Sequence, residues 1–328
     1  MPNERFKFSV APMMDWTDRH CRMFHRAFTK KALLYSEMVT ADAILHGDLE
    51  RLLGFNPDEQ PLALQLGGSD PAKLAKAAKI GADFGYSEIN LNCGCPSDRV
   101  QSGAFGACLM REAERVGECV SAMQAAVNIP VTVKCRIGVD DDEPEERLFS
   151  FVETVSKAGC DVFIVHARKA WLKGLSPKEN RDVPPLDYDL VARLKEARPD
   201  LIIALNGGLP DLEVGLSELP RFDGIMLGRA AYHTPGILGQ VDRRVFGLDV
   251  ADVSEHEALE VYRPYMLAQL QAGSNLHCMT RHMMGLFNGL PGARKWRRIL
   301  SERGPKAMGV EAIEILDEAA AAVQLQTA

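Results

Sequence analysis

Short runs of apolar and β-branched residues recur along the first 230 residues, and each is followed by a segment with helical apolar spacing. The runs are continuously apolar rather than alternating, as parallel strands buried on both faces should be. Segment 70–79 predicts one of the intervening helices, with Asp70 as N-cap and Pro71 as its first residue. We predict eight strands, over residues 8–12, 33–38, 62–66, 86–92, 131–137, 161–167, 201–206 and 224–228.

Eight strand–helix units in about 240 residues match the size and rhythm of a (β/α)₈ TIM barrel. The main alternative is a doubly wound open sheet, but no Gly-x-Gly-x-x-Gly turn follows the first predicted strand. We therefore predict an α/β protein built on a TIM barrel.

The pattern changes after residue 248, where strand-like runs stop and helical spacing continues. Ser254 and Glu257 form a capping-box signature at the start of this region. We predict a barrel domain over 1–248 and a small all-α C-terminal domain over 249–328. Its helices are expected at 254–272, 275–288, 292–303 and 309–324.

The composition, 46% hydrophobic and 25% charged residues in a chain of 328, is that of an ordinary globular protein. No run approaches the ~18 apolar residues of a membrane span, and the N-terminus lacks a secretory signal. Eight cysteines without a regular framework suit a reducing cytoplasm. We expect four of them to be buried structural thiols: Cys21, Cys119, Cys160 and Cys278.

Polar and special residues gather where the predicted strands end, which is where TIM barrels carry their chemistry. The seventh and eighth strands end in the pairs Gly207-Gly208 and Gly228-Arg229, whose glycines allow a backbone to approach a ligand closely. Loops at these two strands are the usual phosphate site of such barrels. Arg229 adds a candidate charge-assisted contact. We therefore expect a phosphorylated cofactor, either flavin mononucleotide (FMN) or pyridoxal phosphate.

Lys134 bears on that choice without deciding it. The lysine would serve a Schiff base with pyridoxal phosphate, or would place a positive charge beside a reduced flavin. Gln65 and Asn92 offer amide hydrogen bonds suited to a planar heterocycle. The non-functional alternative is a salt bridge from Lys134 to Glu88 or to a neighbouring carboxylate.

The segment Cys93-Gly-Cys95-Pro96 is the most unusual local feature. A zinc site needs a further ligand pair, and neither a Cys-x-x-Cys nor a His-x-x-x-His partner exists, so we expect no metal. Cys95 opens a glycine-containing segment at a strand end, where a thiol can act as a general acid. Gly103 and Gly106 would let this segment close over a substrate.

Six segments in order through the barrel resemble the tRNA-dihydrouridine synthases. The segment HARKAWLKGLSPKENR, residues 166–181, is similar to the A-type bacterial branch of that family, and Cys93 departs from it where we expect an aliphatic residue. The segments that carry the resemblance are 11–18 (APMMDWTD), 88–96 (EINLNCGCP), 133–138 (VKCRIG), 165–168 (VHAR), 206–208 (NGG) and 227–229 (LGR).

The resemblance implies an FMN-dependent, NADPH-driven reduction of uridine in the tRNA D-loop, at positions 20 and 20a. Hydride would pass from flavin N5 to uracil C6, Cys95 would protonate C5, and Asn92 would contact the uracil. The uridine would have to flip out of its stack to reach the barrel. By position, the implied FMN ligands are Pro12, Met13, Met14, Gln65, Lys134, His166, Asn206, Gly207, Gly208, Gly228 and Arg229.

The net charge of −7 argues against a nucleic-acid partner until it is divided by segment. Residues 166–181 carry five basic side chains against one acidic, and residues 277–308 carry seven against one. These stretches total +10, which leaves −17 for the rest of the chain. Charge runs are usually solvated faces, and without the predicted barrel that explanation would be favoured. By resemblance, the candidate tRNA contacts are Lys178, Arg181, Arg294 and Arg297.

Two other functions compete with this hypothesis. A flavin barrel acting on a free pyrimidine, such as a dihydroorotate-type dehydrogenase, would not need the basic helical domain. A non-catalytic RNA-binding protein would need no flavin. We expect the protein to be a monomer.

Overall fold

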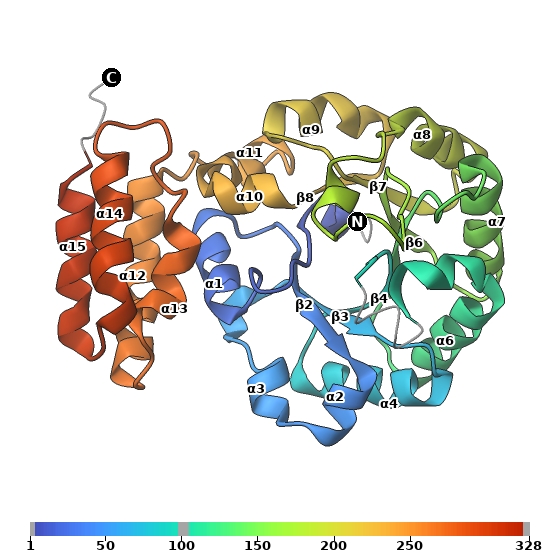
Figure 1. Ribbon diagram of the computed structural model, residues 1–328, viewed down its shortest axis with the longest axis horizontal. Helices are drawn as coiled ribbons and strands as arrows, with labels where there is room; N and C mark the ends of the chain where they lie inside the picture. The colour runs from blue at the N-terminus through green and yellow to red at the C-terminus, as the bar shows by residue number, and fades with distance from the viewer. Residues whose placement is uncertain (1–3, 98–104, 324–328) are drawn as a thin grey trace. The chain divides into compact units, whose positions relative to one another are not determined.

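The computed structural model describes residues 4–97 and 105–323. The eight predicted strands are all present, with ends shifted by a few residues at most, which confirms the α/β prediction (Figure 1). The strands are β1 (Phe8–Val10), β2 (Leu34–Thr40), β3 (Leu62–Gly67), β4 (Glu88–Cys93), β5 (Val131–Arg136), β6 (Val162–His166), β7 (Ile202–Asn206) and β8 (Gly224–Leu227).

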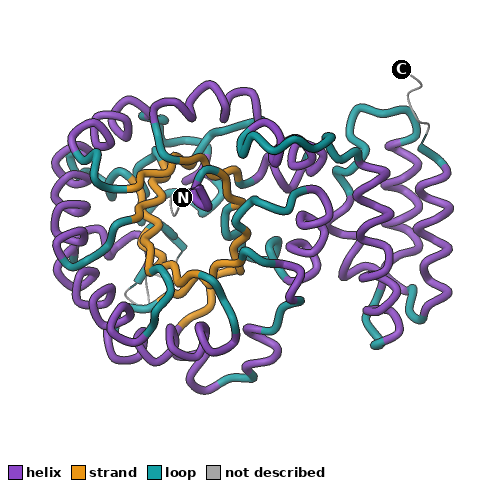
Figure 2. The backbone as a smooth tube through the Cα atoms, turned by 180° about the vertical axis from the view of Figure 1, so that it is seen from behind, coloured by secondary structure: helices purple, strands orange, loops and turns teal. Residues whose placement is uncertain are grey.

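All paired strands are parallel, and each pairs with the next in sequence from β2 to β8, while β8 also pairs with β1. A parallel bridge between Ser9 and Leu33 brings β1 to the start of β2 and completes the ring. Figure 2 shows the strands as this inner ring with helices outside it. The fold is therefore the predicted TIM barrel.

The helices of the barrel follow the strands and cover their outer faces. Asp70 caps α4 as predicted, because its carboxylate accepts a hydrogen bond from the Lys73 amide at 3.0 Å and Pro71 is the first helical residue. These helices are α2 (Ala41–His46), α3 (Leu49–Leu53), α4 (Pro71–Phe84), α6 (Ala113–Ala126), α7 (Pro144–Lys157), α8 (Tyr188–Ala197) and α9 (Leu212–Glu218).

Side chains of alternate strand residues fill the inside of the barrel, as the two-residue period of a strand requires. This interior cluster is mostly apolar, with Tyr35 as its hydroxyl-bearing member. Its buried members are Phe6, Ala11, Leu33, Tyr35, Ala63, Val162, Ile164, Ala204 and Met226. Side chains two residues farther along the same strands therefore face the interior nearer the C-terminal strand ends.

The described residues fall into two compact units. The barrel unit contains the residues up to Met14 and Leu33–Gly228, and the helical unit contains Asp15–Ala32 and the residues from Arg229 onward. The domain boundary predicted at residue 248 stays a prediction. The helices of the helical unit are α1 (Arg19–Phe28), α10 (Arg229–His233), α11 (Val241–Arg244), α12 (Glu255–Gln271), α13 (Leu276–Thr280), α14 (Ala293–Arg303) and α15 (Ile313–Ala321).

Helix α1 joins the helical unit because it packs against α12. The Tyr262 hydroxyl donates to the His20 carbonyl at 3.0 Å, and the Phe24 and Tyr262 rings lie 5.3 Å apart. The capping box predicted at Ser254 is present, with Glu257 bonded back to the Ser254 amide at 2.8 Å.

Two predictions about the helical unit are wrong in detail. The helix expected over 275–288 ends at Thr280, where a short 3-10 turn (Arg281–Met283) follows. Cys278 is exposed rather than buried, because its position in the short α13 faces away from the packed side. Residue 324, the expected end of the last helix, lies outside the described residues.

Among those described, no helix combines the length and hydrophobicity needed to cross a bilayer.

Candidate active site

Five predicted site residues lie on barrel strands near their C-terminal ends and are at least partly buried. Three of them stand two residues beyond interior-cluster members on the same strand, so their side chains face the barrel interior. Strand register aligns Asn92 with Lys134 and His166 with Asn206. The five are Gln65 on β3, Asn92 on β4, Lys134 on β5, His166 on β6 and Asn206 on β7.

The Lys134 ammonium is bonded to Asn206 rather than to Glu88. Its Nζ donates to Asn206 Oδ1 at 2.8 Å, and Asn206 Nδ2 donates to the Met226 carbonyl at 2.8 Å. Burial, together with the nearby Arg136 charge, lowers the pKa of Lys134 from 10.5 to about 8. The salt bridge considered as an alternative does not form, and two of the three ammonium hydrogens remain available to a ligand.

His166 is buried, and burial together with the charge of Arg136 holds its pKa well below the ordinary 6.5. Its imidazole is therefore neutral near pH 7, with one donor and one acceptor nitrogen. The ring lies directly over Gly207, where a Cβ would come within 2.1 Å of His166 Cδ2.

The two glycines after β7 have left-handed backbones, with φ of +103° at Gly207 and +67° at Gly208. A Cβ at Gly208 would lie 2.3 Å from Leu186 Cδ1. The space that these glycines leave open is therefore used by His166 and Leu186 of the protein itself. The expectation that a ligand approaches the backbone of these glycines stays a prediction.

Cys95 follows β4 and is held by the side chain of Asn92. Asn92 Oδ1 accepts hydrogen bonds from the amides of Gly94 at 3.1 Å and Cys95 at 3.0 Å, and Cys95 O accepts from the Ala107 amide at 2.9 Å. The thiol is partly exposed, and its Sγ lies 3.5 Å from Ser97 Oγ. These bonds fix the Cys95 backbone on both sides.

The two glycines proposed as hinges lie at the far end of the Cys95 segment. Gly103 lies outside the described residues. Gly106 has a φ of +76° and begins a short 3-10 helix that ends at Arg111.

Arg136 has a structural role that sequence reasoning did not assign. Its buried guanidinium donates to three carbonyls: Gly94 at 2.9 Å, Lys169 at 3.0 Å and Asn180 at 2.9 Å. The first lies beside Cys95 and the other two belong to the basic segment after β6. Arg136 therefore ties the Cys95 segment to the segment 166–181. The only sequence signal was a second cation within a buried strand.

The remaining predicted cofactor residues follow β1 and β8. The Ala11 amide donates to the Leu227 carbonyl at 2.8 Å, so the two chains leave the sheet side by side. Met13 packs on the interior cluster, while Met14 is 54% exposed. Of the others, Pro12 precedes Met13, Gly228 ends the barrel unit, and Arg229 begins α10 of the helical unit.

The donor set fits a flavin. Asn92 keeps one N–H, Gln65 keeps one N–H and one lone pair, Lys134 keeps two N–H groups, and His166 is neutral. A planar ring with alternating acceptors and donors, bearing negative charge when reduced, suits this combination. Within the described residues no group of three or more His, Cys, Asp or Glu side chains has the geometry of a metal site.

The predicted tRNA contacts are exposed. Lys178 and Arg181 flank a short 3-10 turn after β6, and Arg294 and Arg297 lie on α14. Trp296, between the two arginines, is fully buried and donates its indole N–H to the Met283 carbonyl at 3.1 Å. Trp296 thus fixes the helix, and the arginines face solvent.

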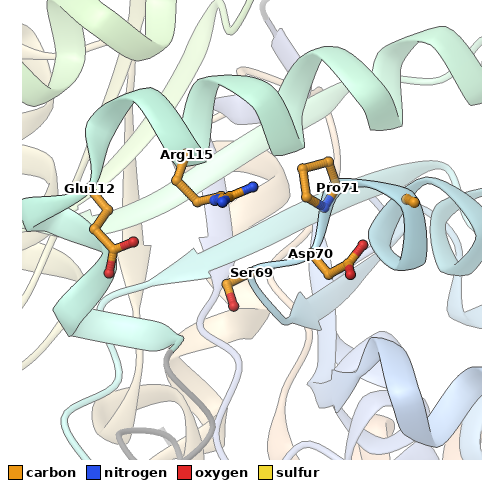
Figure 3. Close-up of a pocket in the computed structure, with 6 residues that line it drawn as sticks. Ser69, Asp70, Pro71, Glu112 and Arg115 are labelled. Atoms are coloured by element: carbon orange, nitrogen blue, oxygen red, sulfur yellow. The ribbon is translucent and has the colours of Figure 1, made fainter.

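Figure 3 shows a surface pocket at the starts of α4 and α6 that contains none of these residues. Its charged groups serve the helices: Asp70 caps α4, and Arg115 pairs with Glu118 at 3.0 Å. The pocket is lined by Ser69, Asp70, Pro71, Ala72, Glu112 and Arg115. We do not assign the chemistry to it.

The sequence matches the family model described as "Dihydrouridine synthase (Dus)" over residues 9–323. Its relatives include proteins named tRNA-dihydrouridine(20/20a) synthase. The protein from Xanthomonas campestris pv. campestris is 57% identical over 91% of this chain and 89% of its own. The protein from Shewanella oneidensis is 56% identical over 94% of this chain and 92% of its own. The protein from Escherichia coli O6:H1 is 55% identical over 92% of this chain and 91% of its own. This sequence similarity covers nearly the whole chain, and it agrees with the TIM barrel and with the polar residues at its strand ends. The protein therefore belongs to the dihydrouridine synthase family.

Proposed function

We propose that this protein reduces the C5=C6 bond of uridine in the tRNA D-loop to give 5,6-dihydrouridine, at positions 20 and 20a. The family is flavin-dependent, and the relatives named above carry these positions in their names. The observation that carries the proposal is the partly exposed Cys95 thiol, held by Asn92 at the end of a strand whose neighbours present Gln65 and Lys134 to the barrel interior.

We assign FMN to the C-terminal end of the barrel. When bound, FMN supplies the hydride that uridine C6 receives, and NADPH restores it. Lys134 stabilises negative charge on the bound ring, and Gln65 and His166 offer neutral hydrogen-bonding groups whose orientations the protein fixes. The ligands are Pro12, Met13, Met14, Gln65, Lys134, His166, Asn206, Gly207, Gly208, Gly228 and Arg229.

Cys95 is the general acid in this proposal. As a C–H bond forms at C5 of the uracil, the Sγ–H bond of Cys95 breaks, and the resulting thiolate recovers a proton from water. The remaining N–H of Asn92 is assigned to the uracil. Because the Asn92 oxygen also holds the Cys95 amide, the residue that contacts the base also sets the position of the acid.

The tRNA is bound through its phosphates by exposed cations on two basic segments, and the target uridine flips out of its stack. Lys178 and Arg181 belong to the barrel unit, and Arg294 and Arg297 to the helical unit. Arg136 anchors the segment that carries Lys178.

Cys95→Ala tests the assignment of the acid. We expect the variant to retain FMN and NADPH oxidation while dihydrouridine formation falls by about 10²-fold or more, the usual contribution of a positioned acid. Cys108→Ala, which removes another partly buried thiol in the same region, is the matched control and should stay active. Normal dihydrouridine formation by Cys95→Ala would contradict the assignment.

The double change Arg294→Ala and Arg297→Ala tests the tRNA surface. Binding should weaken, and the slope of log affinity against log salt should fall by about 2, one for each lost phosphate contact. Lys79→Ala with Arg115→Ala removes two exposed charges from barrel helices and is the control. An unchanged slope would show that the arginines do not touch phosphate. Mapping dihydrouridine in tRNA from cells with the gene deleted and restored tests positions 20 and 20a.

A further inference from the structure

A continuous chain of side-chain hydrogen bonds runs through the barrel interior from the start of β4 to the Cys95 segment. All of its members are buried, and every link but one lies near 2.8 Å. The links are Thr132 Oγ1 to Glu88 Oε1 at 2.7 Å, Asn90 Nδ2 to Thr132 Oγ1 at 2.8 Å, Gln65 Nε2 to Asn90 Oδ1 at 2.8 Å, Asn92 Nδ2 to Gln65 Oε1 at 2.8 Å, and Cys95 N to Asn92 Oδ1 at 3.0 Å. We call these side chains, from Glu88 to Asn92, the interior polar chain.

At the Glu88 end of the interior polar chain, the donor and the acceptor of each hydrogen bond are fixed. An ionised carboxylate only accepts hydrogen bonds, so the Thr132 hydroxyl must donate to Glu88. The Thr132 oxygen is then left to accept, and Asn90 must turn its Nδ2 toward it. Asn90 Oδ1 consequently faces Gln65, and Gln65 must present its Nε2 there.

At the Asn92 end, the backbone amides independently require the same donors and acceptors. The backbone amides of Gly94 and Cys95 can only donate, so Asn92 must turn its oxygen toward them. Its Nδ2 then faces Gln65, whose Oε1 must accept. The side-chain amides of Asn90, Gln65 and Asn92 therefore satisfy both ends of the interior polar chain in a single orientation.

Glu88 is held as an acceptor by its other partners. The Tyr35 hydroxyl donates to the same Oε1 at 2.8 Å, and the Arg5 guanidinium lies 3.6 Å from Oε2. Burial raises the pKa of Glu88, and Thr132, Arg5 and Tyr35 offset only part of that rise. The carboxylate thus has cationic and hydroxyl partners at the end of the barrel remote from Cys95.

We propose that Glu88 and Thr132 are positioning residues for the reaction, because they hold Asn90, and through it Gln65, in the same orientation that the Gly94 and Cys95 amides impose through Asn92. Glu88 itself touches neither the cofactor nor the base. Gln65 thereby keeps one N–H and one lone pair for the flavin, and its Oε1 stays turned toward Asn92, whose oxygen holds the Cys95 amide. The inference rests on the proposed roles of Gln65 and Cys95.

Two hydroxyl deletions separate this role from simple stability. Thr132→Val and Tyr35→Phe each remove one donor to Glu88 Oε1, but only Thr132→Val also removes the acceptor of Asn90 and so breaks the interior polar chain. Thr132→Ser keeps the hydroxyl and is the rescue variant. If Thr132→Val does not fold, Thr132→Ala removes the same hydroxyl in a smaller side chain.

Two readouts do not depend on turnover: the visible spectrum of the bound flavin, and the rate at which iodoacetamide alkylates Cys95, measured by peptide mass spectrometry in flavin-free protein. With Thr132→Val we expect a shifted spectrum and a rate changed by about tenfold, the effect of one lost hydrogen bond. Tyr35→Phe and Thr132→Ser should match the wild type in both. The dihydrouridine kcat should fall only in Thr132→Val.

Equal behaviour of Thr132→Val and Tyr35→Phe in the spectrum and the alkylation rate would overturn the proposal, as would failure of Thr132→Ser to restore the wild-type values. These outcomes are independent of the proposed function. If Cys95 is not the acid, Cys95→Ala stays active, whereas the spectrum and alkylation rate of Thr132→Val still report whether the interior polar chain positions Gln65 and Cys95.

Discussion

Replacing Lys134 with methionine should stabilise the flavin-free protein while weakening flavin binding. Burial lowers the pKa of Lys134 from 10.5 to about 8, and at about 1.4 kcal/mol per pKa unit this corresponds to a cost of about 3 kcal/mol at neutral pH. The side chain keeps some exposure, so this value is an upper bound. Methionine preserves most of the apolar stem but loses the bond to Asn206 Oδ1, worth about 1 kcal/mol. We expect a net gain of about 2 kcal/mol.

The pH dependence of this gain has a definite sign. Below pH 8 the lysine is protonated in both the folded and the unfolded chain, so the full cost of burying the charge is present. Between pH 8 and about 10.5 the unfolded chain binds more protons than the folded one, and wild-type stability therefore rises with pH. The advantage of Lys134→Met should be largest below pH 8 and should disappear near pH 10.5.

The measurement is urea unfolding of the flavin-free proteins at several pH values from about 6.5 to 10, compared as the difference between variant and wild type so that other titrating groups cancel. Lys195→Met is the control: Lys195 pairs with Asp223 at 2.7 Å, and its loss should destabilise the protein. If Lys134→Met is less stable at pH 7, or its advantage does not change with pH, the buried ammonium does not carry the cost assigned to it.

Two further changes test the glycine loop and the helical unit. Gly207→Ala should lower stability by about 2–3 kcal/mol in thermal unfolding, because of both its positive φ and the 2.1 Å approach to His166; Gly174→Ala, with a φ of +84° and open space around it, should show the backbone cost alone. Burial raises the pKa of Asp18, but hydrogen bonding and charge from His282 lower it well below the ordinary 3.8. Asp18→Asn should therefore cost about 2–3 kcal/mol at pH 7, and the difference from wild type should shrink as the pH falls below about 4; a constant difference would contradict this.

The barrel could be predicted because its information is local. Parallel strands buried on both faces must be continuously apolar, so the runs that end at Gln65, Asn92 and Asn206 marked both the strands and the end at which polar side chains collect. Cap residues such as Asp70 and Ser254 fixed helix starts for the same reason, since their partners lie within three residues.

Features that depend on distant partners could not be predicted. Nothing beside Gly207 in the sequence indicates that His166, about forty residues earlier, occupies the space above it. The three carbonyls that Arg136 binds lie on three different segments. Helix α1 follows β1 in the chain, yet it packs with α12 because Phe24 and Tyr262 complete one aromatic cluster.

The arrangement of buried charge explains why Lys134 is available to a ligand. Glu88 is a buried carboxylate of the barrel interior, and buried charges are usually paired with an opposite charge. Here Tyr35 and Thr132 both donate to Glu88 Oε1 and the Arg5 charge lies 3.6 Å from Oε2, while Lys134 donates to the neutral amide of Asn206. The neutral amides between them keep the two charges apart. The lysine thus remains a positive charge that the protein does not compensate, which lowers its pKa and favours a ligand that brings negative charge to that end of the barrel.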